Sequence, residues 1–182
     1  MKDLSLNLLD IAENSVKAGA TLTQLLLTQE AGILTFQVVD DGCGMTEEVL
    51  RGVVDPFYTT RTTRKVGMGL PLLRMAAEQT GGTMTVESRH VDVDPDNHGT
   101  VVTAVFHTDH IDCPPVGDMT ATVTTLIQGH PDTDFYFRHV CDGTEVELDT
   151  RALREILGEV SLAEFEVLQW ITGYLTDQYN GQ

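Results

Sequence analysis

DDGCG occupies residues 40–44 of this 182-residue chain, directly after a predicted strand from Ile33 to Val39. A plain Asp-Gly turn would lead into the second strand of a hairpin. Instead, Thr46 is followed by two glutamates, a pattern that predicts a helix with Thr46 as its N-cap. Because glycine adopts positive φ without strain, Gly42 and Gly44 permit a tight connection of another kind. The turn is therefore a candidate ligand site rather than a link between two strands.

Upstream of this turn, residues 3–18 predict a helix, because apolar side chains recur at three-to-four spacing and Gly19 follows as a cap. Asp10, Asn14 and Lys17 stand at i, i+4 and i+7, so they share one face of it. An Asn oxygen suits Mg²⁺, a Lys side chain supplies charge to phosphates, and a carboxylate can orient or deprotonate water. On a lone helix, simple solvent exposure of Asp10 and Asn14 would be the better interpretation.

Downstream of the turn, residues 55–66 (DPFYTTRTTRKV) hold two Thr-Thr pairs and three cations and predict a mobile loop. GMGL at residues 67–70 then opens a helix predicted to end near Thr80, and the free N–H groups of a helix start attract phosphate. Two further strands are predicted at 84–88 and 100–106. The order helix, hairpin, short helix, loop, helix, hairpin indicates an α+β fold, a two-layer sandwich with helices on one face of an antiparallel or mixed sheet.

Taken in order, these pieces resemble the N, G1, F, G2 and G3 boxes of the Bergerat-fold ATPase superfamily. That superfamily includes DNA gyrase, the ninety-kilodalton heat-shock chaperones, histidine kinases and mismatch-repair ATPases. The resemblance covers residues 3–107. The stretch from the first to the second glycine box most resembles histidine kinases and anti-sigma-factor kinases, whereas residues 10–21 resemble mismatch-repair ATPases. The resemblance implies a histidine-kinase-like sandwich that binds ATP and Mg²⁺.

The resemblance also implies a role for individual residues. Asp10 corresponds to the catalytic carboxylate, which is Glu in the gyrase-like branches, and Asn14 to the ligand of Mg²⁺. Asp40 corresponds to the residue that reads the adenine amino group, assisted by Thr100 through water. Residues 58–66 correspond to a short lid. The implied nucleotide-binding residues are Asn14, Lys17, Asp40, Gly42, Gly44, Met45, Thr59, Thr60, Arg61, Gly67, Met68, Gly69, Leu70 and Thr100.

Two consecutive prolines, Pro114 and Pro115, predict a boundary between an ATP-binding domain (1–110) and a small acidic C-terminal α+β domain (111–182). Residues 118–129 fit a helix, although their threonines also fit a strand. A hairpin around 142–143 and two helices follow, and residues 161–164 (SLAE) predict a capping box at the last helix.

One possible metal site lies next to this boundary. His107, His110 and Cys113 are spaced three apart and are of metal-ligating type. They follow a predicted strand and precede two prolines, and no fourth ligand accompanies them. The sequence therefore leaves a metal site open at this position.

Charge narrows the classes of partner. The chain holds 28 acidic and 11 basic side chains, a net charge of −17, and has no basic stretch, which excludes nucleic acid and anionic membranes. No apolar run approaches a membrane span, no targeting signal is present, and three scattered cysteines suit a reducing compartment, so we expect a cytoplasmic protein.

Residues 111–182 hold 13 acids and three arginines, which predicts a protein partner with a basic surface; a homodimer stays open.

Two functions follow from the resemblance. The first is an enzyme, a stand-alone ATPase or protein kinase that hydrolyses ATP or transfers its γ-phosphate to a partner. Because the ATP-binding domain begins close to Met1, we expect no dimerisation helices or phosphoacceptor His of its own. The second is a regulator of weak or no turnover, in which bound nucleotide changes how the C-terminal domain meets its partner.

Overall fold

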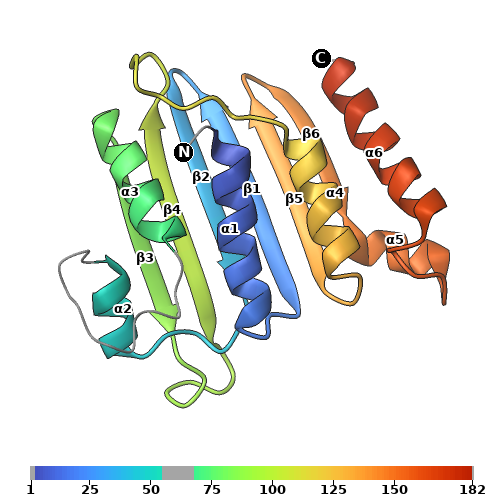
Figure 1. Ribbon diagram of the computed structural model, residues 1–182, viewed down its shortest axis with the longest axis horizontal. Helices are drawn as coiled ribbons and strands as arrows, with labels where there is room; N and C mark the ends of the chain where they lie inside the picture. Colours follow the sequence, from blue (N-terminus) through green and yellow to red (C-terminus); the bar gives the residue numbers. More distant parts are fainter. Residues whose placement is uncertain (1–2, 55–67, 182) are drawn as a thin grey trace.

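The computed structural model describes residues 3–54 and 68–181. Six helices and six strands lie within these residues, arranged as in Figure 1. In chain order they are α1 (Leu4–Lys17), β1 (Leu22–Glu30), β2 (Ile33–Asp40), α2 (Glu47–Val54), α3 (Gly69–Gln79), β3 (Thr83–Arg89), β4 (Gly99–His107), α4 (Met119–Gly129), β5 (Asp134–Cys141), β6 (Thr144–Asp149), α5 (Thr150–Leu157) and α6 (Phe165–Asn180).

The strands form one six-stranded mixed sheet in the order β3-β4-β2-β1-β5-β6. All neighbours are antiparallel except β1 and β5, which run parallel from the pair Leu22–Asp134 to the pair Gln29–Cys141. Helices α1, α3 and α4 lie across one face (Figure 1). The predicted α+β sandwich, with helices on one face of a mixed sheet, is confirmed.

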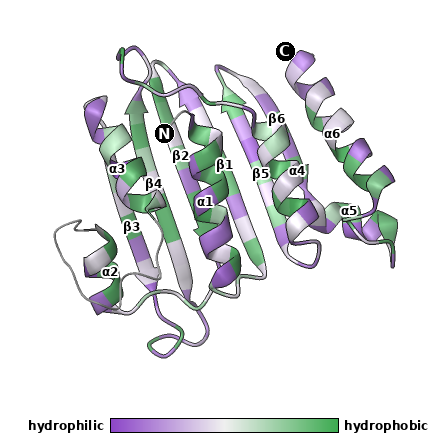
Figure 2. Ribbon diagram, viewed as in Figure 1, coloured by the Kyte–Doolittle hydropathy of each residue, from purple (hydrophilic) through white to green (hydrophobic). Residues whose placement is uncertain are grey.

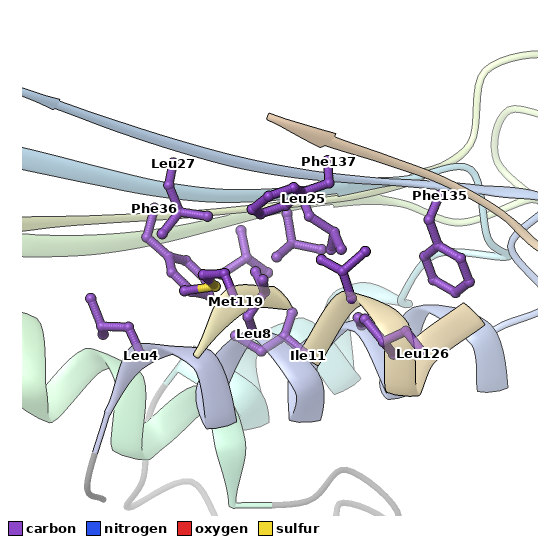
Figure 3. Packing of buried hydrophobic residues seen from close by; sticks show 14 of the residues in the cluster. Leu4, Leu8, Ile11, Leu25, Leu27, Phe36, Met119, Leu126, Phe135 and Phe137 are labelled. Carbon is purple, nitrogen blue, oxygen red and sulfur yellow. The ribbon is translucent and has the colours of Figure 1, made fainter. Parts of the chain in front are cut away.

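Alternation along the strands explains why one face is covered. Buried and half-exposed residues alternate in β1, β2 and β4, and Figure 2 shows the same banding of hydrophobic and hydrophilic residues. Since successive strand side chains point to opposite faces, every second residue meets the helices. Figure 3 shows side chains of the sheet packed against those of α1 and α4: Leu25, Leu27, Phe36 and Phe137 against Leu8, Ile11, Met119 and Leu126. Each fully buried side chain of this size contributes about 1.5–3 kcal/mol.

The segment around the two prolines holds the start of α1. The backbone N–H groups of Leu4 and Ser5 donate to the carbonyls of Pro115 and Val116, both at 2.9 Å. The first N–H groups of a helix have no partner inside the helix. Residues of the predicted boundary therefore complete the first turn of the N-terminal helix.

Residues 111–182 do not fold around a sheet of their own. Their strands β5 and β6 extend the sheet of the N-terminal part, and their buried residues belong to the same cluster as those of α1. The division into two domains near residue 110 stays a prediction. Residues 118–129 contain a helix, with Asp118 accepting from the backbone N–H of Ala121 at 2.9 Å.

The predicted capping box at the last helix is wrong. Helix α6 begins at Phe165 with Glu164 as its N-cap, and no side chain caps it. The Ser161 hydroxyl instead accepts from the backbone N–H of Ala163 at 3.1 Å, inside the preceding turn. The Ser161 hydroxyl thus caps a turn that precedes the helix and does not cap the helix itself.

Candidate functional site

A cavity of 340 Å³ lies beside the last two turns of α1, at the end of β2. Its walls combine apolar side chains with a few polar groups that point to one place. This is the composition expected of a site for a flat, partly polar ligand. The lining residues are Ile11, Asn14, Ser15, Lys17, Ala18, Asp40, Cys43, Gly44, Met45, Leu70, Thr100 and Val102.

Asp40 is held at the base of this cavity by two hydrogen bonds. The Ser15 hydroxyl donates to Asp40 Oδ2 at 2.7 Å, and the backbone N–H of Gly42 donates to Oδ1 at 2.9 Å. A carboxylate oxygen has about two acceptor positions, so each oxygen keeps one more. The carboxylate is therefore fixed in orientation and still able to accept from a ligand amine.

Asp41 has a different task, although it is the next residue. Its carboxylate accepts from the backbone N–H groups of Thr21 (2.7 Å) and Leu22 (3.0 Å) and from the Thr21 hydroxyl. Burial alone would raise the pKa of Asp41, but the N–H groups of Leu22 and Thr21 and the Thr21 hydroxyl lower it on balance. Asp41 thus ties the turn to the start of β1.

Gly44 allows the turn to pass close to the neighbouring strand. Its φ is +73°, and a Cβ atom built on it would lie 2.0 Å from the carbonyl oxygen of Arg89. Only glycine fits such a backbone contact. The backbone N–H of Val91 also donates to the Cys43 carbonyl at 2.8 Å, and His98 Nδ1 lies 2.5 Å from the Gly42 carbonyl oxygen. Gly44 therefore packs against the end of β3 and also lines the cavity, whereas Gly42 is not among the lining residues.

Thr100, which lines the cavity next to Asp40, belongs to a small network of hydroxyl groups. It is the register partner of Asp40 across β2 and β4, and its hydroxyl lies 2.8 Å from the Ser88 hydroxyl. Ser88 Oγ also accepts from the backbone N–H of Met45 at 2.8 Å. This network joins β3, β4 and the end of the turn. Asp40, Thr100 and Met45 consequently form one wall.

The residues of the predicted phosphate side are placed in part. Asn14 and Lys17 line the cavity one turn apart on α1, as their spacing implied. Asp10 is exposed and does not line it; a Cβ atom on Gly69 would lie 3.3 Å from Asp10 Cβ. Leu70 lines the cavity, whereas the Met68 side chain is exposed.

The remaining predicted residues, Thr59, Thr60, Arg61 and Gly67, lie outside the described residues, as does the lid.

Reasoning from the sequence missed Ser15 and Ser88. Ser15 follows Asn14 directly and is only 3% exposed in the structure, but a lone serine in the helix sequence gave no sign of this burial. Ser88 is the register partner of Thr100 in β3 and β4, a relation visible only once the hairpin register is known. Both serines fix the orientation of a residue that had been predicted.

The described residues contain no candidate metal centre and no candidate membrane span. Within residues 3–54 and 68–181, no group of three or more His, Cys, Asp or Glu side chains could hold a metal ion, and this includes His107, His110 and Cys113. Over the same ranges, no helix has the length and apolar character needed to cross a membrane.

The sandwich, and the cavity at the turn, agree with the fold and site that the resemblance implied. Residues 2–110 match the family described as histidine kinase-, DNA gyrase B- and HSP90-like ATPase. Because this match spans more than half of the chain, the chain belongs to that family. The family match ends at residue 110, while the sheet continues into β5 and β6.

Curated relatives come from bacterial sensor kinases. The chain is 31% identical over 88 residues to the sensor histidine kinase ZraS of Klebsiella oxytoca, which is 48% of this chain and 19% of that protein. It is 29% identical over 85 residues to the sensor histidine kinase CitA of Klebsiella pneumoniae (45% and 16%) and 28% identical over 87 residues to the sensor protein KdpD of Clostridium acetobutylicum (45% and 10%). The chain thus matches less than a fifth of the length of these relatives.

Proposed function

We propose that this protein binds ATP with Mg²⁺ in the cavity beside α1 and transfers the γ-phosphate to a protein partner or to water. The observation that carries the proposal is the convergence of Asn14, Lys17, Asp40 and Thr100, from three separate elements, on one cavity with apolar walls. The apolar walls suit the faces of adenine, and the fixed Asp40 carboxylate suits its amino group.

The chemistry of the donors fits the metal as well. The Asn14 side chain offers a neutral oxygen at the cavity, and Mg²⁺ takes few protein ligands, completing its shell with phosphate oxygens and water. Bound there, Mg²⁺ would neutralise charge on the phosphates. Lys17, one turn further along α1, supplies a positive charge on the same side. We place the protein in the cytoplasm, where ATP and reduced thiols occur together.

The position of Asp10 favours a second candidate. Asp10 does not line the described cavity and sits beside Gly69 at the start of α3. A carboxylate can activate water only within hydrogen-bond reach of it. A regulator that binds ATP without appreciable turnover, and changes its contact with a partner, is therefore the alternative function.

One experiment separates the two functions. ATP affinity, with and without Mg²⁺, and phosphate release are measured for the wild type, for Asp10→Asn, and for the remote exposed control Glu30→Gln. Release above the buffer rate that falls at least about tenfold in Asp10→Asn alone supports the enzyme. Tight binding with release at the buffer rate in all three supports the regulator.

Partner transfer needs its own measurement. The protein is incubated with γ-labelled ATP and each protein that is purified with it after co-expression, and label on the partner is counted. Label that depends on Asp10 supports the kinase version. Failure of the wild type to bind ATP at all would overturn both functions.

A further inference from the structure

Large apolar side chains are exposed where α5 and α6 lie beside β6, at the opposite edge of the sheet from β3 (Figure 1). Ile156 is 82% exposed, Trp170 52% and Tyr174 41%. We call these three residues the α5–α6 surface. None of them contacts the nucleotide cavity. A contiguous exposed apolar surface is typical of an interaction site.

Two hollows flank Trp170 in this surface. One, of 630 Å³, lies between β6, α5 and α6, and the other, of 350 Å³, lies between α5 and the first turns of α6. Leu153, Ile156 and Trp170 line both. Each hollow is large enough for a bulky side chain of a partner, and Trp170 forms the ridge between them.

The ridge is preorganised. The rings of Trp170 and Tyr174 stack at a centroid distance of 4.9 Å and an interplanar angle of 12°. Gln178, one turn beyond Tyr174, donates to the Glu147 carbonyl and accepts from its backbone N–H, both at 3.0 Å, and so fixes α6 along the edge of β6. A partner would meet a rigid aromatic face, which also attracts Lys or Arg side chains by cation–π interaction.

Acidic side chains border both hollows. Glu145, Glu147 and Asp149 line the larger one and Glu166 lines the smaller. The only cations of residues 111–182 are three arginines, and each is already in an ion pair: Arg138 with Glu145, Arg151 with Asp149, and Arg154 with Asp134. Glu145 and Asp149 are thus neutralised by arginines. Glu147 and Glu166 have no ion pair among the described residues and make the border complementary to a cationic partner. A second copy of this chain, with a net charge of −17, would bring acid against acid.

We propose that the α5–α6 surface binds a basic, amphipathic segment of a partner protein. A bulky apolar side chain of that segment enters a hollow beside Trp170, and its Lys or Arg side chains face Glu147 and Glu166.

Trp170 provides the signal for the test, since it is the only tryptophan of the chain. The full chain is titrated with a synthetic helix that carries Leu and Phe on one face and Lys and Arg on the other. We expect a saturable shift of the Trp170 emission. A peptide of the same composition, with its apolar residues scattered around the helix, should bind about tenfold more weakly.

Variants test the two parts of the surface separately. Ile156→Ser should weaken binding about tenfold through the lost apolar contact, and Glu147→Lys with Glu166→Lys should weaken it at least as much and reduce its salt dependence. The matched double charge reversal Glu30→Lys with Asp109→Lys, at exposed acids outside the surface, should bind as the wild type does. ATP affinity, measured in parallel, should not change in any of them.

Three outcomes would overturn the proposal. Equal binding of the two peptides would mean attraction by charge alone, and equal loss in the control variant would mean that no particular surface is used. Dimerisation of the wild type that Ile156→Ser abolishes, without peptide binding, would mean that the surface meets a second copy.

Discussion

Two regions beside this sheet use polar groups in opposite ways. One is the nucleotide end, the cavity where β2 ends, and the other is the α5–α6 end, the α5–α6 surface beside β6. At the nucleotide end, Asp40, Asp41 and Ser88 make hydrogen bonds that fix the turn beside the cavity. At the α5–α6 end, the fixed elements are aromatic rings, and the acids at the border stay at the surface. A site for one small ligand needs its donors and acceptors oriented, whereas a surface for a protein segment needs area and charge. The comparison predicts that substitutions at the nucleotide end change ligand binding or stability by disturbing oriented hydrogen bonds. Substitutions at the α5–α6 end should change partner binding by removing apolar contact area.

The largest effect is expected from separating the two ends. A chain that stops after Asp112 leaves β1 without its parallel partner β5 and α1 without the carbonyls of Pro115 and Val116. We expect it to lose cooperative unfolding in a urea titration, because an unpaired, apolar inner strand cannot stay an edge. As a control, the full chain with a protease site after Asp112 is cut and should remain one folded complex. Cooperative urea unfolding of the short chain, with a midpoint close to that of the full chain, would show that residues 1–110 are an independent domain.

Asp40 and Asp41 form a matched pair at the nucleotide end. Asp40→Asn should weaken ATP binding about 100-fold, since a charge-assisted acceptor is lost where the adenine amino group is expected. Asp41→Asn should leave the ATP affinity of the folded protein unchanged and lower the free energy of unfolding by about 1–2 kcal/mol, because it removes part of the anchor to Thr21 and Leu22. Calorimetry and urea unfolding give the two quantities. Unchanged ATP affinity in Asp40→Asn would contradict the placement of adenine.

The close backbone approach at Gly44 can be tested against another glycine. Gly44→Ala should lower the free energy of unfolding by about 2–4 kcal/mol, because positive φ and contact with the Arg89 carbonyl both oppose a Cβ atom. Gly19 has φ of +78° but nothing within 4 Å of the added atom, so Gly19→Ala should cost only about 1 kcal/mol. Equal costs at the two positions would mean that strain, and not the packing of the turn, makes glycine necessary.

His139, in β5, makes stability depend on pH. Burial lowers the pKa of His139, so the folded protein keeps the ring neutral while the unfolded chain takes up a proton below about pH 6.5. Stability present above that pH is lost as the pH falls toward the lower pKa of the folded state. His139→Asn cannot titrate but can still hydrogen-bond to the Tyr179 hydroxyl, now 2.8 Å from Nδ1. The free energy of unfolding of this variant should fall less steeply between about pH 6.5 and pH 5, by up to about 1.4 kcal/mol per pH unit. Parallel pH profiles would show that His139 is not the group responsible.

The smallest effect is expected on the α5–α6 surface. Ile156→Ser should change the free energy of unfolding by less than about 0.5 kcal/mol, because this side chain is already in water. Leu153→Ser, one turn earlier and 8% exposed, should cost about 2–3 kcal/mol. Thermal unfolding of both variants gives the difference. A large cost at Ile156 would mean that the residue supports the fold, and the case for a docking surface would weaken.

Local patterns in the sequence were enough for the N-terminal part. Apolar periodicity placed α1 and the strands up to β4 within a few residues, and Gly44 of the predicted turn lines a cavity in the structure. Asp40 and Thr100, sixty residues apart in the sequence, are direct partners in the sheet. The resemblance had implied only that Thr100 assists Asp40 through water.

The pairing of strands far apart in the chain could not be predicted from the sequence. Nothing near Leu22 indicates that it pairs with Asp134, because parallel partners share no turn signal. The roles of Ser15 and Ser88 depend on which side chain faces them across the fold, and a single hydroxyl carries no local signature. The predicted start of α6 was wrong because the pattern of residues 161–164 (SLAE) occurs in turns as well as at the N-termini of helices.

The parallel contact between β1 and β5 also sets an order of events during synthesis. The hairpins β1–β2 and β3–β4 join residues close in sequence and can form soon after they emerge, but β1 must wait for residues 134–141. Until then, a strand that will be central has one side without a neighbour. The nascent chain therefore passes through a stage at which its motif-bearing part is already translated while one side of it can still pair with the wrong strand.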